Sequence, residues 1–300
     1  MPELPDIELY RVRLEERILG ETLESIRIPS PFVLRSFATA PSELEKRKVV
    51  AVERLGKRIV LALEGEFFVV IHLMISGRLQ WQSGPAVAAT GRSKDLLVIF
   101  QFSSGRLTLL ESTSRKRASI HLVGGRSGLL EHRRNGIDVA ASDTEEFSFR
   151  LREKNRTLKR ALTDPHSFDG IGNAFSDEIL FHAKLSPMRL TGSLTDTEVE
   201  TLHSASRDTL RDWTERLQQQ VKGFPKSADV TAFRPDYAVH GRFGKPCLVC
   251  GSPIQHIVYS ENETNYCSKC QNEGRLLADR SLSRLLKSDW PKTLEEMDGN

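Results

Sequence analysis

All four cysteines of the 300-residue chain lie in one short segment. Cys247, Cys250, Cys267 and Cys270 form two C-x2-C pairs that are separated by sixteen residues. This spacing is typical of tetrahedral zinc held by four thiolates, with each pair on a tight turn. Two disulfides or four unrelated thiols are the alternatives, and a cytosolic chain disfavours disulfides. So short a segment buries too little apolar surface to fold alone, and we therefore expect one structural Zn2+ to stabilise a zinc ribbon.

The first half of the chain has a helical pattern followed by strand patterns. Ile7, Tyr10, Leu14 and Ile18 recur at spacings of three and four, which predicts an amphipathic helix over residues 6–19. From about residue 26 to residue 123, short apolar runs bounded by turn residues predict an antiparallel β-sandwich. Turn sequences at residues 64–66 and 103–105 predict two hairpins, and residues 83–94 predict a loop.

After about residue 143 the apolar spacing becomes helical. Thr195 and Glu198 form a predicted capping box at a helix start. The predicted buried stripe of that helix comprises Val199, Leu202, Leu210, Trp213 and Leu217. Residues 222–236 contain two prolines and predict a loop. We therefore divide the chain into an N-terminal domain at 1–125, a helical domain at 143–236, a finger at 237–271 and a tail at 272–300. The tail has a candidate short helix through Leu282, Leu285 and Leu286.

Composition restricts the class of protein only weakly. The chain has 43 Lys and Arg against 40 Asp and Glu, a net charge of +3, which neither supports nor excludes a nucleic-acid partner. No apolar stretch reaches the length of a membrane span. The N-terminus lacks the basic-then-apolar order of a signal peptide. We therefore expect a cytoplasmic protein without membrane contact, associated with the nucleoid if its source is bacterial.

The chain begins Met-Pro-Glu, and the second residue is a candidate nucleophile. Removal of Met1 would expose the secondary amine of Pro2, and an α-amino group has a pKa of about 8, so much of it is neutral near pH 7. Such an amine can attack C1′ of a deoxyribose, and Glu3 could move protons beside it. Many chains begin in this way, so the terminus alone also allows an ordinary surface role.

The chain resembles the formamidopyrimidine-DNA glycosylase and endonuclease VIII family from residue 2 to about residue 271. The run Pro-Glu-Leu-Pro at residues 2–5 carries the resemblance together with Lys57, the run Gly-Ile-Gly-Asn at residues 170–173 followed by Asp-Glu at 177–178, and the four-cysteine finger. These features follow one another in the family's order. The resemblance implies an α+β, two-domain fold, in which the N-terminal antiparallel β-sandwich begins with a catalytic helix. A helix-two-turn-helix lobe and the zinc finger complete the implied fold.

The resemblance also implies roles for individual residues. Pro2 is then the nucleophile, Glu3 the acid and base, and Lys57 contacts a phosphate beside the lesion. Asn173, at the start of a helix, and Lys159 correspond to further phosphate contacts. An N-cap role for Asn173 and a solvated surface role for Lys57 are the alternatives.

The sequence departs from the family pattern at three places. The family's His-Leu-Gly-Met-Ser-Gly reads His-Leu-Met-Ile-Ser-Gly at residues 72–77, so Met74 or Ile75 would fill the gap left by an extruded base, unless Met74 is a core residue. The Arg-Arg-Phe wedge loop is replaced by a run without phenylalanine, whose basic residues Arg115, Lys116 and Arg117 we expect to face DNA. A finger arginine that grips phosphate is replaced by Asn262, which brings no charge.

We therefore expect an enzyme that removes a damaged, most simply an oxidised, base from double-stranded DNA and then cleaves the strand at the abasic site. The expected partner is DNA with a damaged base or an abasic site, and the expected state is a monomer. A non-catalytic protein that binds damaged or branched DNA is one alternative. An abasic-site lyase with little glycosylase activity is another.

Overall fold

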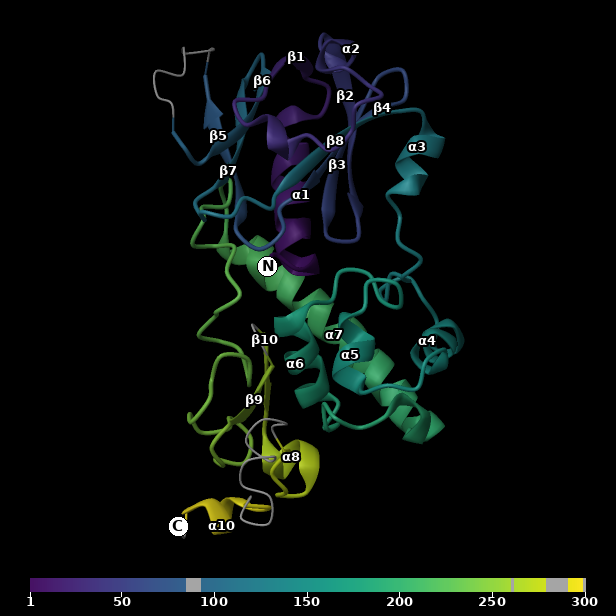
Figure 1. Cartoon of the computed structure of the whole chain (residues 1–300), viewed down its shortest axis with the longest axis vertical. Coiled ribbons are helices and arrows are strands. Elements are labelled where there is room, and N and C mark those ends of the chain that lie inside the picture. Colours follow the sequence, from purple (N-terminus) through teal and green to yellow (C-terminus); the bar gives the residue numbers. More distant parts are fainter. Residues whose placement is uncertain (85–92, 260–261, 279–290, 299–300) are drawn as a thin grey trace. The chain divides into compact units, whose positions relative to one another are not determined.

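The computed structural model describes residues 1–84, 93–259, 262–278 and 291–298 (Figure 1). The chain divides into two compact units, and each is treated by itself. The sheet unit comprises Met1–Arg134 and Trp213–Ala232, and the helical unit comprises Asn135–Asp212 and Phe233–Asn300.

The sheet unit is built on one antiparallel sheet of eight strands, in the order β5-β7-β6-β1-β2-β3-β4-β8. Its elements are α1 (Leu4–Ile18), β1 (Thr22–Arg27), η1 (Pro31–Val33), α2 (Pro41–Leu44), β2 (Arg47–Leu55), β3 (Arg58–Leu63), β4 (Phe67–His72), β5 (Gly77–Ser83), β6 (Leu96–Phe102), β7 (Gly105–Glu111), β8 (Ser119–Gly124) and α3 (Arg126–Glu131). Both predicted hairpins are present, as β3–β4 and β6–β7.

The predicted sandwich is formed by the two halves of this single sheet, which are joined where β1 pairs with β2. Apolar side chains from both halves share one core, including Phe100 of β6 and Ile71 of β4. The helix α1 contributes to the same core, and Figure 1 shows it between the two sets of strands. The core therefore fixes α1, and with it the chain terminus, against the sheet.

The helix α1 confirms the predicted stripe, because Ile7, Tyr10, Leu14 and Ile18 are all fully buried. It begins at Leu4, two residues earlier than the predicted start. The carboxylate of Asp6 accepts a hydrogen bond from the backbone N of Glu3 at 2.9 Å, which satisfies a free donor before the first turn. Helical residues therefore follow the second residue of the chain almost at once.

The helical unit contains short helices and the cysteine segment. Its elements are α4 (Thr144–Arg152), α5 (Leu158–Thr163), α6 (Asn173–His182), η2 (Thr191–Ser193), α7 (Asp196–Gln220, which enters the sheet unit at Trp213), β9 (Gln255–Tyr259), β10 (Asn262–Tyr266), α8 (Ser268–Asn272) and α10 (Leu294–Asp298). The predicted capping box is confirmed, since the Thr195 N lies 2.8 Å from Glu198 Oε2 and the Glu198 N lies 3.3 Å from Thr195 Oγ1. The five predicted stripe residues of α7 are buried.

The two units divide the chain in a different way from the predicted domains, which also separate a finger and a tail. Residues 213–232 belong to the sheet unit, because Val230 and Phe224 pack on its core and Arg13 Nη2 donates to the carbonyls of Gln218 and Val221, at 2.8 Å each. The predicted finger at 237–271 lies within the helical unit. Most of the predicted loop at 83–94 and the predicted tail helix lie outside the described residues.

Candidate active site and zinc finger

The two residues that follow Met1 are buried. Pro2 is buried, and the Glu3 side chain and backbone together are only 3% exposed. Glu3 stands at the N-cap position of α1, and its carbonyl accepts the first helical bond from Ile7 N at 3.0 Å. A proline and a carboxylate are therefore held side by side on a rigid element, which is how reacting groups are usually positioned.

The chain-terminal amine lies in an environment that favours its neutral form. Burial lowers the pKa of the Met1 amine below its ordinary value, and the positive charges of Arg78 and Lys57 act in the same direction. The carboxylates of Glu3 and Asp6 oppose them without reversing the shift. A neutral amine is the nucleophilic form, so the same environment would favour attack by the secondary amine of Pro2 once Met1 is removed.

Lys57 comes to this terminus from the tight turn between β2 and β3. The preceding Gly56 has φ of 59°, a conformation that glycine adopts without strain. Lys57 itself is half-buried. The structure therefore brings three predicted residues, Pro2, Glu3 and Lys57, into one electrostatic neighbourhood.

The turn between β4 and β5, at residues 73–77, presents one apolar side chain to solvent. Ile75 is 48% exposed, whereas Met74 is half-buried. Met74 has a positive φ of 54°, which is the left-handed region that glycine, the family's residue here, adopts most easily. Of the two predicted wedge residues, Ile75 is therefore the more exposed.

The three predicted basic residues of the 112–118 loop have different surroundings. Arg115 is exposed, and Arg117 is half-buried. Lys116 is half-buried, and its ammonium lies 3.1 Å from Asp95 Oδ1 and also contacts the Glu111 carbonyl. The Lys116 ammonium is therefore bound by groups of the protein itself.

A buried polar network in the helical unit occupies another predicted DNA contact. Lys159 is 8% exposed, and its Nζ lies 2.6 Å from both Asp177 Oδ1 and the Asn173 carbonyl. The other oxygen of Asp177 lies 2.7 Å from His240 Nδ1 and accepts from Asn265 N at 3.1 Å. Lys159 therefore makes a buried ion pair that joins α5 to α6.

Asn173 begins α6, and Gly172 is the N-cap, so the capping alternative for Asn173 does not hold. Its side-chain amide donates to the Glu263 carbonyl of β10 at 2.9 Å. Gly170 has φ of 83°, so the preceding turn requires glycine. Asn173 therefore links the start of α6 to the finger hairpin.

The backbone of Asn262 pairs with Tyr259 at the beginning of β10, and the contacts of the Asn262 side chain lie outside the described part of the chain.

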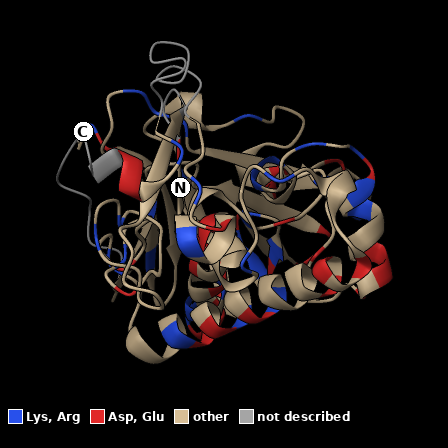
Figure 2. Cartoon of the chain, turned by 90° about the horizontal axis from the view of Figure 1, so that it is seen from below, with Lys and Arg blue, Asp and Glu red and all other residues tan. Residues whose placement is uncertain are grey.

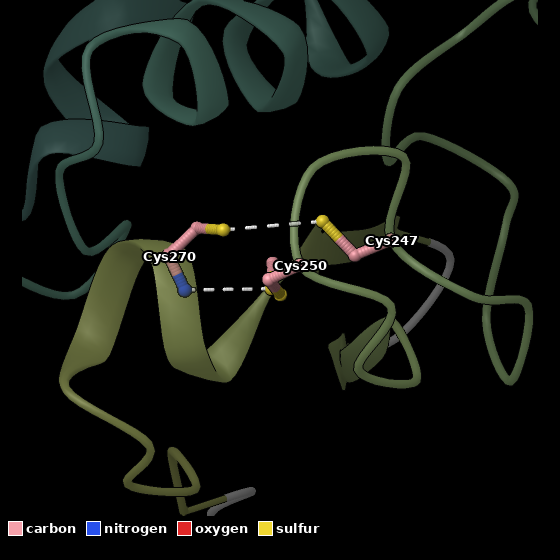
Figure 3. A group of neighbouring side chains, drawn as sticks. Cys247, Cys250 and Cys270 are labelled. Atoms are coloured by element: carbon pink, nitrogen blue, oxygen red, sulfur yellow. Dashed lines mark hydrogen bonds between the residues drawn. The ribbon is translucent and has the colours of Figure 1, made fainter.

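The four cysteines form the expected metal site. Their sulfur atoms all lie within 4.8 Å of one another, with Cys250 Sγ and Cys267 Sγ 3.4 Å apart and Cys247 Sγ and Cys270 Sγ 3.9 Å apart. Figure 3 shows the labelled side chains of this group converging from α8 and from the preceding loop. Backbone amides also approach two sulfurs, which favours thiolates. Four thiolates fill a tetrahedral zinc site and leave no open position, so the metal is structural.

The cysteine segment is anchored to α6 by a second carboxylate. Glu178 is 1% exposed and accepts hydrogen bonds from the backbone N of Ala238, Val239 and His240, at distances of 2.7–2.9 Å. Burial raises the pKa of Glu178 despite these bonds. The sequence resemblance marked Glu178 as a motif residue, and the structure shows what its carboxylate contacts.

Sequence reasoning missed two residues that organise the 73–77 turn. Arg78 Nη1 donates to the Gly77 carbonyl at 2.8 Å and to the Ile75 carbonyl at 3.3 Å. Glu111 is 1% exposed and contacts both this turn and the 112–118 loop. A signal existed for Glu111, because it continues the inward-facing alternation of Leu107 and Leu109 as a charged residue. No local pattern distinguishes Arg78.

Acidic and basic residues are interspersed along the long helix α7, as Figure 2 shows. In the described ranges of the chain, no helix is long and apolar enough to cross a membrane.

The structure combines an N-terminal helix packed on a folded sheet with a helical unit and a four-cysteine finger, and these parts define a class of two-part proteins. The chain matches this class in order: residues 1–120 match the formamidopyrimidine-DNA glycosylase N-terminal domain, residues 137–223 match its H2TH domain, and residues 244–272 match the zinc finger found in FPG and IleRS. The four cysteines therefore bind one structural zinc ion.

Full-length relatives agree with these matches. A formamidopyrimidine-DNA glycosylase of Thermus thermophilus is 33% identical over 286 residues, covering 91% of this chain and 100% of the relative. That of Bacillus subtilis is 30% identical over 285 residues, with 91% and 100% coverage. The chain belongs to the formamidopyrimidine-DNA glycosylase family.

Solved structures show the same fold. The MutM (Fpg) protein from Thermus thermophilus superposes with a TM-score of 0.73 at 30% identity, covering 91% of this chain and 100% of that one. The Lactococcus lactis Fpg in complex with an abasic site containing DNA gives a TM-score of 0.77 at 25% identity, with 90% and 99% coverage.

Proposed function

We propose that this protein is a DNA glycosylase with abasic-site lyase activity, acting as a monomer in base excision repair. The observation that carries the proposal is the buried Pro2–Glu3 terminus, beside Lys57, in an environment that lowers the pKa of the terminal amine. Relatives with the same domain order are named for this activity. Since those relatives are bacterial, we also place the protein in the cytoplasm, at the nucleoid.

The chemistry needs a secondary amine that is free and unprotonated. The Pro2 nitrogen would attack C1′ of the damaged nucleotide, and the base would leave with the electron pair of the broken C1′–N bond and take up a proton. The Pro2 nitrogen loses its proton, and the C1′–O4′ bond then opens as O4′ takes up a proton, which gives an iminium at C1′. The iminium acidifies the C2′ proton, whose removal expels the 3′ phosphate. Glu3, next to Pro2, is positioned to give and accept these protons.

DNA recognition in this proposal relies on phosphate contacts and on extrusion of the damaged nucleotide. Lys57 and the N-terminus of α6 at Asn173 would hold phosphates, and Ile75 and Arg115 would enter the space left by the extruded base. One solved Lactococcus lactis complex contains an oxidized pyrimidine, which supports an oxidised base as the lesion for this chain.

Borohydride trapping on abasic-site DNA tests this proposal. The wild-type protein is expected to form a covalent adduct, because borohydride reduces the iminium. Pro2→Gly should lower adduct formation and strand cleavage, since it replaces the secondary amine. Glu3→Gln should reduce release of a damaged base while the Pro2 nitrogen remains.

A lyase with little glycosylase activity is the second candidate. It is favoured by the internal contacts of Lys116 and Lys159 and by the uncharged Asn262, because each removes a cation from the expected DNA contacts. Adduct formation on abasic DNA without release of oxidised bases from duplexes would support it. No adduct at all with an intact Pro2 would instead support a protein that only binds damaged DNA.

A further inference from the structure

One buried carboxylate connects the two segments that project the wedge candidates. Glu111 ends β7 directly opposite Gly77 of β5, and it is 1% exposed. Its Oε1 accepts a hydrogen bond from Ser76 Oγ at 2.7 Å. Its Oε2 accepts from the backbone N of Arg117 at 2.8 Å and of Ala118 at 2.9 Å. Each oxygen therefore serves a different segment, Oε1 the 73–77 turn and Oε2 the 112–118 loop.

A second contact joins the same segments on the solvent side. Ser76 Oγ lies 3.0 Å from Thr113 Oγ1, and Thr113 Oγ1 lies 3.2 Å from the Arg115 carbonyl. The Ser76 hydroxyl therefore contributes to both connections, because it contacts both Glu111 and Thr113. Hydrogen bonds to a buried carboxylate are among the stronger ones in proteins, so the Glu111 contacts dominate.

The side chains that these segments present lie next to the bonded groups. Ile75 precedes Ser76 and is 48% exposed, and Arg115 lies in the loop that the Glu111 carboxylate closes and is also exposed. The hydrogen bonds of Glu111 and Ser76 therefore hold the apolar side chain of Ile75 and the cation of Arg115 in fixed positions relative to each other. Those are the two kinds of group that fill a gap in a base stack and hold the opposite strand.

We propose that Glu111 is a positioning residue, which holds Ile75 and Arg115 together so that they enter the duplex as one unit when the damaged nucleotide is extruded. The inference rests on the proposed function and adds a specificity device to it. Glu111 acts through Ile75 and Arg115, so its effect is confined to the step that requires extrusion.

Two substitutions test the connection between the 73–77 turn and the 112–118 loop and are expected to leave the fold intact. Ser76→Ala removes the turn's bond to Glu111 and leaves both backbone bonds of the 112–118 loop in place. Glu111→Gln keeps the size of the side chain and removes its charge, so both segments are held by weaker, neutral hydrogen bonds, with the amide NH2 donating to the Ser76 hydroxyl. Ser104→Ala, in the hairpin between β6 and β7, is the matched control.

The test compares two substrates with each variant. Single-turnover base release is measured on a duplex with an oxidised base, and borohydride adduct formation is measured on a single-stranded abasic oligonucleotide, which requires no extrusion. Ser76→Ala and Glu111→Gln should slow base release about tenfold or more, because small misplacements of positioning groups carry such costs. Adduct formation on the single strand should match that of wild type and of Ser104→Ala.

Unchanged duplex release by Ser76→Ala would overturn the inference, as would an equal loss on both substrates by the two variants, since that indicates general damage to the fold. Absence of an adduct with the wild-type protein would overturn the proposed function instead, so the two failures are distinguishable.

Discussion

At the scale of single residues, the region around the terminus depends on glycines in tight turns. Gly77 stands where the 73–77 turn re-enters the sheet, and its backbone N donates to the Leu73 carbonyl at 2.9 Å. A Cβ at this position would lie 2.4 Å from the Leu73 oxygen and 3.0 Å from the Ala118 Cβ. The close approach of two backbone segments explains why the turn ends in glycine.

Gly77→Ala should therefore lower the free energy of unfolding by about 1–3 kcal/mol, the usual cost of overpacking. Urea unfolding followed by circular dichroism measures the change. Gly223→Ala is the control, because a Cβ there meets nothing within 4 Å. Equal stability of the two variants would mean that the turn can relax without cost.

At the scale of elements, the finger is held to α6 by buried polar groups as well as by its metal. Phe181 of α6 packs with Val239, Ile254 and two cysteines in one core. Glu178 binds three successive backbone amides of the segment that leads into the finger. The segment between α7 and the finger is thus fixed by a carboxylate even though it forms no helix or strand.

Glu178→Ala should release this segment, because three buried amides lose their acceptor and each unsatisfied donor costs about 1–3 kcal/mol. Hydrogen exchange followed by mass spectrometry is expected to show faster exchange in the peptide covering residues 238–240, with the β3–β4 hairpin unchanged. Glu178→Gln, which retains one acceptor oxygen, should lie between wild type and Glu178→Ala. Protection equal to wild type in Glu178→Ala would show that the metal alone holds the segment.

At the scale of the whole molecule, histidines couple the stability of the sheet unit to pH. Burial, with the charges of Arg58, Arg134, Lys57 and His121, lowers the pKa of His72 to about 3. Burial and the neighbouring His132, Arg58 and Arg35 likewise lower the pKa of His121 to about 4. The folded protein therefore keeps both histidines neutral at pH values where the unfolded chain, with an ordinary histidine pKa near 6.5, binds protons.

Because the unfolded chain binds these protons more readily, the free energy of unfolding decreases as the pH is lowered. Above about pH 6.5 both states are neutral at His72 and its contribution is constant. Below it the free energy of unfolding should fall by up to about 1.4 kcal/mol per pH unit until His72 protonates in the folded state. His72→Gln should lose less stability than wild type between pH 7 and pH 5 in urea unfolding. The exposed His166→Gln is the control, and identical slopes for wild type and His72→Gln would contradict the pKa shift.

The sequence predicted features of this molecule that depend on local spacing. The α1 stripe, the two hairpins, the capping box at Thr195 and the four-cysteine site were all visible as short patterns. Contacts between distant segments were not. Residues 213–232 join the sheet unit through Arg13 and Tyr10, and Lys159 pairs with Asp177 because tertiary packing brings α5 to α6. Lysine looks the same in sequence whether it faces solvent or a buried carboxylate.

The central claim concerns one atom, the nitrogen of Pro2, and the most direct measurement locates the covalent bond that it makes. Wild-type protein is trapped with borohydride on a single-stranded abasic oligonucleotide, digested, and sequenced by tandem mass spectrometry. The account predicts that the reduced sugar is attached to a peptide that begins at Pro2. Attachment to a lysine, or to the amine of a chain that still begins with Met1, would contradict it.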